Sequence, residues 1–231
     1  MPRKPEGTES RSDRKHRAIL EAASTIFLTH GYLGTNMDLI AAEAQTSKQT
    51  VYKHFGSKEA LFVEIVTSIT DAAGDQVHKD RPELGDDPDL GELLREYAER
   101  QLIIVLQPRV LQLRRTVISE AGRFPELARV LYERGPKRAI GELTTLFTEL
   151  RDRGLLTIDD PAHEAERFNW LIMAAPLNRG MLLGDEALPS RAQLRRHVAD
   201  AVQFFLAACN TGAATAPPRR SAQRSRTGTR P

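Results

Sequence analysis

Apolar residues recur along this chain at the spacing of helices rather than that of strands. In the range 11–30, Ile19, Ala23 and Phe27 each fall four positions apart, and Gly31 follows where a helix commonly ends. The same period continues, with breaks, through most of the chain, and no segment alternates apolar and polar residues as a half-buried strand does. The pattern therefore predicts an all-α fold.

Prolines mark where several of these helices are expected to begin. Proline suits the first turn of a helix, because no N–H bond is needed there and its φ is already helical. One more proline, Pro176, lies inside the apolar run 170–183 and is expected to kink or divide that helix. The prolines that precede apolar runs, and so predict helix starts, are Pro108, Pro125, Pro136, Pro161 and Pro189.

Two polar stretches interrupt or end the helical pattern. Residues 79–89 are polar and acidic and contain Pro82, Gly85 and Pro88, which predicts a domain boundary. Residues 210–231 contain five arginines but no acidic and no aromatic residue, so they cannot bury enough apolar surface to fold. We expect a disordered, solvated tail there.

Composition narrows the class of protein. The formal net charge is +2, from 33 basic and 31 acidic residues, which excludes a polycationic coat protein but not a locally basic surface. The single cysteine, Cys209, cannot form an internal disulfide, which fits a reducing cytosol. No apolar run reaches the ~18 residues needed to cross a bilayer, and the first ten residues are too polar for a signal peptide. We expect a cytoplasmic protein without a membrane partner.

The densest signal lies between Thr35 and Lys58, where the pattern predicts two short helices joined by a turn. Thr35 is the expected cap of the first helix, with Asp38 as its partner three residues on. Ser47 is the expected cap of the second helix, residues 48–55. Because so short a helix is marginal alone, it must rest on its neighbours, as in a helix-turn-helix. A further helix is expected from residue 58 to about residue 70.

The second short helix places polar side chains on one outer face. If Val51 and Phe55 point inward, then at ~100° per residue Gln49 and Lys53 point outward, next to Thr50. Glutamine can pair with adenine, lysine with guanine or phosphate, and threonine with an acceptor or a thymine methyl group. Phosphate contacts from Tyr52, Lys53 and His54 would fix register. The same pattern also occurs in all-α domains that never meet nucleic acid.

This region resembles the DNA-binding domain of TetR-type regulators. The resemblance implies an all-helical homodimer, with three N-terminal helices that bind operator DNA and larger C-terminal helices that bind an effector. By this resemblance the DNA-contact positions are Thr35, Lys48, Gln49, Thr50, Tyr52, Lys53, His54 and Lys58. The matching residues are Ile19-Leu20-Glu21-Ala22-Ala23, Ile26-Phe27, Gly31-Tyr32, Thr35, Met37-Asp38, Ile40-Ala41, Ser47-Lys48, Val51-Tyr52, His54-Phe55 and Ser57-Lys58-Glu59-Ala60-Leu61.

The turn departs from the family pattern. Gln45-Thr46 stands where the family usually has Gly-Val, so Gln45 is expected to need a left-handed backbone, at a cost of ~1 kcal/mol relative to glycine.

The C-terminal half resembles, more weakly, the AefR-like members of that family, which are repressors linked to efflux or signalling genes. The segments concerned are Leu113-Arg114-Arg115, Ile118-Ser119-Glu120, Phe124-Pro125-Glu126-Leu127-Ala128 and Arg153-Gly154-Leu155-Leu156. The expected organisation is a disordered arm (1–10), a helix-turn-helix domain (11–57), a connecting helix (58–78), a helical effector-binding and dimerisation domain (89–209) and a disordered arginine-rich tail (210–231).

Signals for enzymes are weak. The sequence has no glycine-rich phosphate loop and no Gly-x-Ser-x-Gly elbow, and His163-Glu164 lacks the second histidine of a zinc helix. The six histidines are scattered without ligand spacing, and Cys209 ends an apolar helix, where a packing role is expected. We expect no catalytic residue, no metal and no cofactor.

An apolar effector pocket is expected among the C-terminal helices, with a filled core as the alternative. Two segments, 162–183 and 191–209, are apolar on more than one flank, which predicts a self-paired interface and a dimer that reads palindromic DNA. The expected function is a ligand-responsive repressor, and the alternatives are a helical ligand-binding or scaffold protein and an activator of the same family. The expected pocket residues are Leu106, Phe147, Phe168, Asn169, Trp170, Met173 and Asn178.

Overall fold

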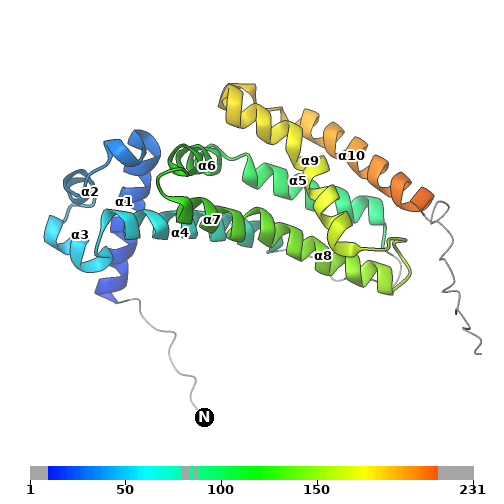
Figure 1. Cartoon of the computed structure of the whole chain (residues 1–231), viewed down its shortest axis with the longest axis horizontal. Helices are drawn as coiled ribbons and strands as arrows, with labels where there is room; N and C mark the ends of the chain where they lie inside the picture. Colours follow the sequence, from blue (N-terminus) through cyan, green and yellow to red (C-terminus); the bar gives the residue numbers. More distant parts are fainter. Residues whose placement is uncertain (1–9, 80–83, 86–87, 213–231) are drawn as a thin grey trace, which may run out of the picture.

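The computed structural model describes residues 10–79, 84–85 and 88–212, with the side chains of residues 210–212 left aside. Within these ranges all regular structure is helical, as the apolar period predicts. Figure 1 shows an elongated molecule with α1, α2 and α3 at one end and α8, α9 and α10 toward the other. The elements are α1 (Arg11–Gly34), α2 (Met37–Glu43), α3 (Lys48–Phe55), α4 (Lys58–His78), α5 (Leu90–Val105), α6 (Pro108–Glu120), α7 (Pro125–Arg134), α8 (Pro136–Asp152), α9 (Pro161–Leu183), the 3-10 turn η1 (Asp185–Ala187) and α10 (Arg191–Gly212).

Some expectations fall partly outside the described residues. The arm 1–10 does so except for Ser10, which caps α1 in a reciprocal hydrogen-bond pair with Asp13. The tail lies outside from residue 213 onward, and the expected start at 210 is wrong because the α10 backbone continues to Gly212. Of the expected boundary, the structure describes the edges, where α4 ends at His78 and Asp89 caps α5.

Prolines begin most of the C-terminal helices. Four of the five expected starts are confirmed, since α6, α7, α8 and α9 each have proline in the first turn. The start at Pro189 is wrong by two residues, because Ser190 caps α10 through the backbone N–H of Gln193. Pro176 does not divide α9, because the helix continues through this buried residue. Helices α5, α8 and α10 pack against α9.

The N-terminal helices follow the predicted plan with one change of cap. Asn36 caps α2, with its Oδ1 accepting bonds from two backbone N–H groups, so the expectation of Thr35 as cap is wrong. Thr35 is buried instead, and its hydroxyl donates to the Gly31 carbonyl at 2.7 Å. Ser47 caps α3 as predicted, and Ser57 caps α4, which runs on to His78 rather than ending near residue 70.

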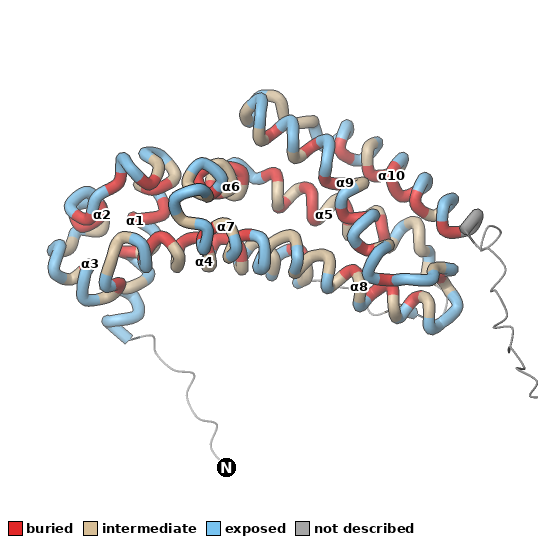
Figure 2. The backbone as a smooth tube through the Cα atoms, viewed as in Figure 1, coloured by how far each residue is buried: buried red, intermediate tan, exposed pale blue. Residues whose placement is uncertain are grey.

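Two apolar clusters, the C-terminal cluster and the N-terminal cluster, hold the molecule together, and Figure 2 shows buried residues in red along helices of both halves. One fills the space among α5, α8, α9 and α10. The other begins with α1–α4, where Phe27 stacks on Phe62 with ring centroids 4.7 Å apart. It extends beyond those helices, because it also contains buried residues of α6 and α7. These are Leu113, Val117, Leu127 and Leu131.

The turn between α2 and α3 contains a left-handed residue, as predicted. Gln45 has a φ of +47°, the one positive φ at a non-glycine residue in the described part of the chain. Its backbone N–H still bonds the Ala42 carbonyl at 3.1 Å, so the turn closes despite the strained conformation.

Replacing Gln45 by glycine is expected to stabilise the protein by about 1 kcal/mol, because glycine adopts positive φ without strain. The midpoint of thermal unfolding should rise. The matched control is Ala42→Gly, three residues earlier on α2, which should lower stability by about 1 kcal/mol because its φ is helical. Destabilisation by both substitutions would contradict the assigned strain.

Candidate nucleic-acid interface and adjoining pocket

Helix α3 is anchored by its inner face. Val51 and Phe55 are buried in the N-terminal cluster, and the ring of His16 on α1 stacks on Phe55 at 4.5 Å. The Ser47 hydroxyl caps the first turn, and Gly56, with a φ of +75°, ends the helix. Eight residues are too few for an independent helix, so these contacts fix its orientation.

The outer face of α3 is made of polar residues, and Figure 2 colours much of this helix as exposed. Gln49 and Lys53 are exposed, and the structure gives neither side chain a hydrogen bond or ion pair within the described residues. Tyr52 beside them is 44% exposed. Thr50 is half-buried, and its hydroxyl lies 2.8 Å from that of Ser47. The face thus offers an amide, an ammonium and a phenol at one surface.

Two other predicted contact residues lie at the edges of this face. The ammonium of Lys48 donates to Asp38 Oδ2 at 2.8 Å, and this carboxylate raises the pKa of Lys48. The pair is open to solvent and therefore weak, so Lys48 can exchange Asp38 for a phosphate at little cost. His54 is half-buried, with its ring centroid 5.7 Å from that of His16.

Thr35 and Lys58 have bonding partners within the protein. The Lys58 ammonium donates to the Thr35 carbonyl at 2.6 Å and lies 4.2 Å from the centroid of the Tyr32 ring. Burial lowers the pKa of Lys58. The Lys58 side chain thus ties the start of α4 to the α1–α2 junction, and the Thr35 hydroxyl is used within that junction; the expected DNA contacts of these two residues stay a prediction. Helical spacing alone does not reveal that a lysine folds back over an aromatic ring.

Contacts between the two halves were not predicted from the sequence. Arg109 of α6 forms a two-point ion pair with Glu21 of α1, at 2.7 and 2.8 Å. Tyr32 donates to Glu59 at 2.7 Å, and its ring meets that of Phe124 edge-on at 4.5 Å between centroids. Burial raises the pKa of Tyr32. No local pattern links Glu21 to a residue 88 positions away.

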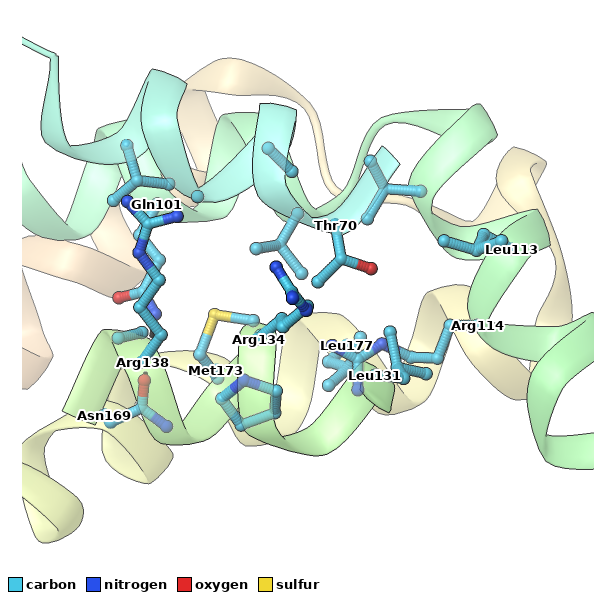
Figure 3. Close-up of a pocket in the computed structure, with 18 of the residues that line it drawn as sticks. Thr70, Gln101, Leu113, Arg114, Leu131, Arg134, Arg138, Asn169, Met173 and Leu177 are labelled. Atoms are coloured by element: carbon cyan, nitrogen blue, oxygen red, sulfur yellow. Dashed lines mark hydrogen bonds between the residues drawn. The ribbon is translucent and has the colours of Figure 1, made fainter. Parts of the chain in front are cut away.

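A cavity lies beside the N-terminal cluster, among α4, α5, α6, α7, α8 and α9 (Figure 3). The space open to the centre of a water-sized sphere measures about 60 Å³. Three of the expected pocket residues, Asn169, Trp170 and Met173, line it. Leu113 and Leu131 line it too and also belong to the N-terminal cluster.

The other four expected pocket residues lie elsewhere. Phe147 and Phe168 pack with Phe205 in the C-terminal cluster, at centroid distances of 4.9 to 5.9 Å, and Leu106 is buried in the same cluster. For these three the filled-core alternative is correct. Asn178 is exposed, and its amide donates to the Ala174 carbonyl at 2.8 Å. Helical period marks an inward face but does not distinguish a packed core from a cavity wall.

The cavity also contains polar side chains that sequence analysis missed. Gln101 of α5 donates to Asn169 Oδ1 at 2.9 Å, and Arg114 of α6 lines the opposite end. Their signal in the sequence is a polar residue flanked by core positions, such as Gln101 beside Leu102 and Arg114 beside Leu113.

Large apolar side chains are exposed on α9 and α10. Leu182 and Leu183 are 78% and 68% exposed, and Phe204 is 67% exposed. Apolar patches of this kind on soluble chains commonly mark interfaces. Cys209, on the same helix α10, is buried, and burial raises its pKa to about 11, so the thiol stays protonated at neutral pH.

The described residues contain neither a candidate membrane span nor a candidate metal cluster. None of the helices within them is long and apolar enough to cross a membrane. Among the same residues, no cluster of three or more His, Cys, Asp or Glu side chains is placed to hold a metal ion.

Two segments of the sequence match models of the same protein family. Residues 19–65 match "Bacterial regulatory proteins, tetR family", and residues 92–210 match "AefR-like transcriptional repressor, C-terminal domain". Among curated relatives, the transcriptional regulator YhgD of Bacillus subtilis is 49% identical over 57 residues, and the repressor SCO4008 of Streptomyces coelicolor is 41% identical over 64. These matches span 25% and 28% of this chain and only 29% and 30% of the relatives' own length.

Solved structures match over most of the chain. A TetR-family protein from Mesorhizobium loti is 36% identical with a TM-score of 0.77, and the match covers 87% of this chain and 98% of that one. The flavonoid-responsive regulator FrrA is 33% identical with a TM-score of 0.70, covering 85% and 97%.

Proposed function

Because the chain belongs to the TetR family of bacterial transcriptional regulators, whose members are not enzymes, we propose that it is a homodimeric repressor that a small molecule releases from a palindromic operator. The observation that carries the proposal is the polar, unpaired outer face of α3, held in place by Val51 and Phe55. We propose repression rather than activation because the C-terminal half matches a domain described as that of an AefR-like transcriptional repressor. A regulator of chromosomal genes acts in the cytoplasm, the compartment that we propose.

The proposed contacts divide by chemistry. Gln49 and Thr50 reach base edges in the major groove, where glutamine pairs with adenine and threonine meets a thymine methyl group. Lys53, which lies at the centre of this face, contacts guanine or phosphate. The remaining groups, Lys48, Tyr52 and His54, contact phosphates and fix the register of the helix.

The proposed domains follow from this division. Residues 11–57 bind DNA, residues 58–78 connect, and residues 89–209 bind the effector and dimerise. Exposed Leu182, Leu183 and Phe204 support a self-paired interface of α9 and α10, because pairing removes their apolar surface from water. A two-fold axis there would present two α3 helices to half-sites about one DNA turn apart, ~34 Å.

The cavity is the proposed effector site. Its walls include Leu113 and Leu131, which also pack in the cluster that supports α3. A ligand that moves these walls shifts the DNA-binding helices directly, in addition to any movement carried by α4. Release requires that the ligand bind the non-operator form more tightly, since equal affinity for both forms shifts nothing. The flavonoid response named for FrrA supports a small-molecule signal.

DNA binding is tested with the promoter next to the protein's own gene, by fluorescence anisotropy at several salt concentrations. Lys53→Ala should weaken binding to all DNA and reduce the slope of log K against log salt by about 1. Gln49→Ala should cost about 1–3 kcal/mol on the operator only, because it removes a base contact. The matched control is Lys137→Met on α8, an exposed lysine paired with Glu133 and not among the proposed DNA contacts, for which the salt slope should stay unchanged.

Equal losses on operator and random DNA for both α3 variants would contradict this division of contacts. No binding by the unchanged protein at physiological salt, to the promoter or to random DNA, would instead favour the scaffold or ligand-binding alternative.

Dimerisation through α9 and α10 is tested by Phe204→Arg. The charge would be buried in the paired interface, so the variant should be monomeric by light scattering and should bind the operator at least ~10-fold more weakly. Tyr132→Arg on α7, at a residue 52% exposed, is the control and should remain dimeric. A dimeric Phe204→Arg variant with unchanged operator affinity would place the interface elsewhere.

A further inference from the structure

Three buried side-chain atoms in the described part of the chain have no hydrogen-bond partner: Tyr97 Oη, Gln101 Oε1 and Arg114 Nε. Buried polar atoms are nearly always bonded, so each exception needs a cause. Gln101 and Arg114 line the cavity described above, and Tyr97 lines a smaller one that adjoins it at Val77 and His78. Gln101 and Arg114 therefore line one cavity, and Tyr97 lines its neighbour.

Arg114 is the least compensated of these groups. Its guanidinium makes no hydrogen bond or ion pair within the described residues, and burial lowers its pKa without a nearby carboxylate to offset the effect. An arginine stays charged even so. The two other arginines of the cavity wall are paired, Arg134 with Asp71 at 2.5 Å and Arg138 with Asp75 at 2.8 Å. Arg114 is thus a largely buried cation that lacks a counter-ion.

The opposite end of the cavity offers a hydrogen-bond acceptor. Gln101 is 3% exposed and its amide nitrogen is used by Asn169, which leaves Oε1 for a donor. Figure 3 shows Gln101 and Asn169 at one end, Arg114 at the other, and Met173 between them. Trp170 and Leu177 add apolar wall from α9.

We propose that this cavity binds an apolar, ring-containing organic anion: Arg114 binds its carboxylate, sulfonate or phenolate, and Gln101 Oε1 accepts a bond from an O–H or N–H group toward its other end. Such a ligand would satisfy both unpartnered atoms and place its rings against Met173 and Trp170. The inference rests on the proposed function only in taking this cavity as the effector site.

The test uses a matched pair of fluorescent probes. The anion 8-anilinonaphthalene-1-sulfonate carries aromatic rings, an N–H and a sulfonate, whereas N-phenyl-1-naphthylamine has the same rings and N–H without the charge. Trp170 is the chain's one tryptophan and lines the cavity, so energy transfer from it reports binding nearby. The full-length protein should bind the anionic probe with one site per protomer.

Arg114→Met should weaken binding of the anionic probe about 10- to 100-fold and leave the affinity for the neutral probe within about 2-fold of that of the unchanged protein. Arg114→Lys should retain most of the preference for the anion. The matched control is Arg129→Met on α7, an exposed arginine outside the cavity, which should change neither affinity. The neutral probe shows that the cavity of each variant is still formed.

A second readout separates a ligand-binding arginine from a structural one. Because Arg114 has no partner in the free protein, Arg114→Met should raise the midpoint of thermal unfolding of the ligand-free protein, and the anionic probe should raise that of the unchanged protein but not of the variant. A lower midpoint for Arg114→Met would show that Arg114 holds the fold together, and would overturn the proposal.

The proposal would also be overturned if Arg114→Met bound the anionic probe as tightly as the unchanged protein does. Binding of the neutral probe at one site, without binding of the anionic probe, would overturn it too. Neither result would touch the proposed function, which stands or falls on operator binding by the unchanged protein.

Discussion

The apolar contact between α6–α7 and the N-terminal helices is the constraint on which the rest of the structure depends. Helix α3 is too short to hold its own shape, so the direction of its polar face is set by what Val51 and Phe55 pack against. That cluster continues into Leu113, Val117 and Leu127 of the C-terminal half. The polar face of α3 is therefore oriented by residues that lie as far along the chain as Leu131, 80 positions from Val51.

This shared cluster gives a physical basis for regulation. The walls of the cavity and the support of α3 have residues in common, and the Arg109–Glu21 ion pair and the Tyr32–Phe124 contact tie the same surfaces together. A close-packed interior transmits a change at one wall rather than absorbing it. Coupling between two such sites is reciprocal. Operator DNA must therefore lower the protein's affinity for the ligand by the same factor by which the ligand lowers the protein's affinity for operator DNA.

Local patterns predicted the parts of the molecule that local chemistry determines. Apolar spacing, a serine cap and two turns of helix were enough to place α3. The positive φ at Gln45 was expected from the family resemblance, because the family usually has glycine at that position. Features that depend on distant residues were not predicted. Lys58 folds onto Tyr32, and Phe147 meets Phe205 in a filled core, only because the tertiary fold brings those partners together. The polar wall of the cavity was not predicted for a related reason. In the sequence Arg114 resembles an ordinary surface arginine, and only the fold places it in a cavity wall.

Amide hydrogen exchange in the native state tests the shared cluster most directly. Leu127→Ala removes a buried side chain of α7 and should cost about 2–5 kcal/mol. If the two halves form one cooperative unit, the slowest amides of α1, around Phe27, should lose the same free energy of protection as those of α7 itself. Unchanged protection in α1, with loss confined to the C-terminal helices, would show that the DNA-binding helices stand independently and would contradict this account.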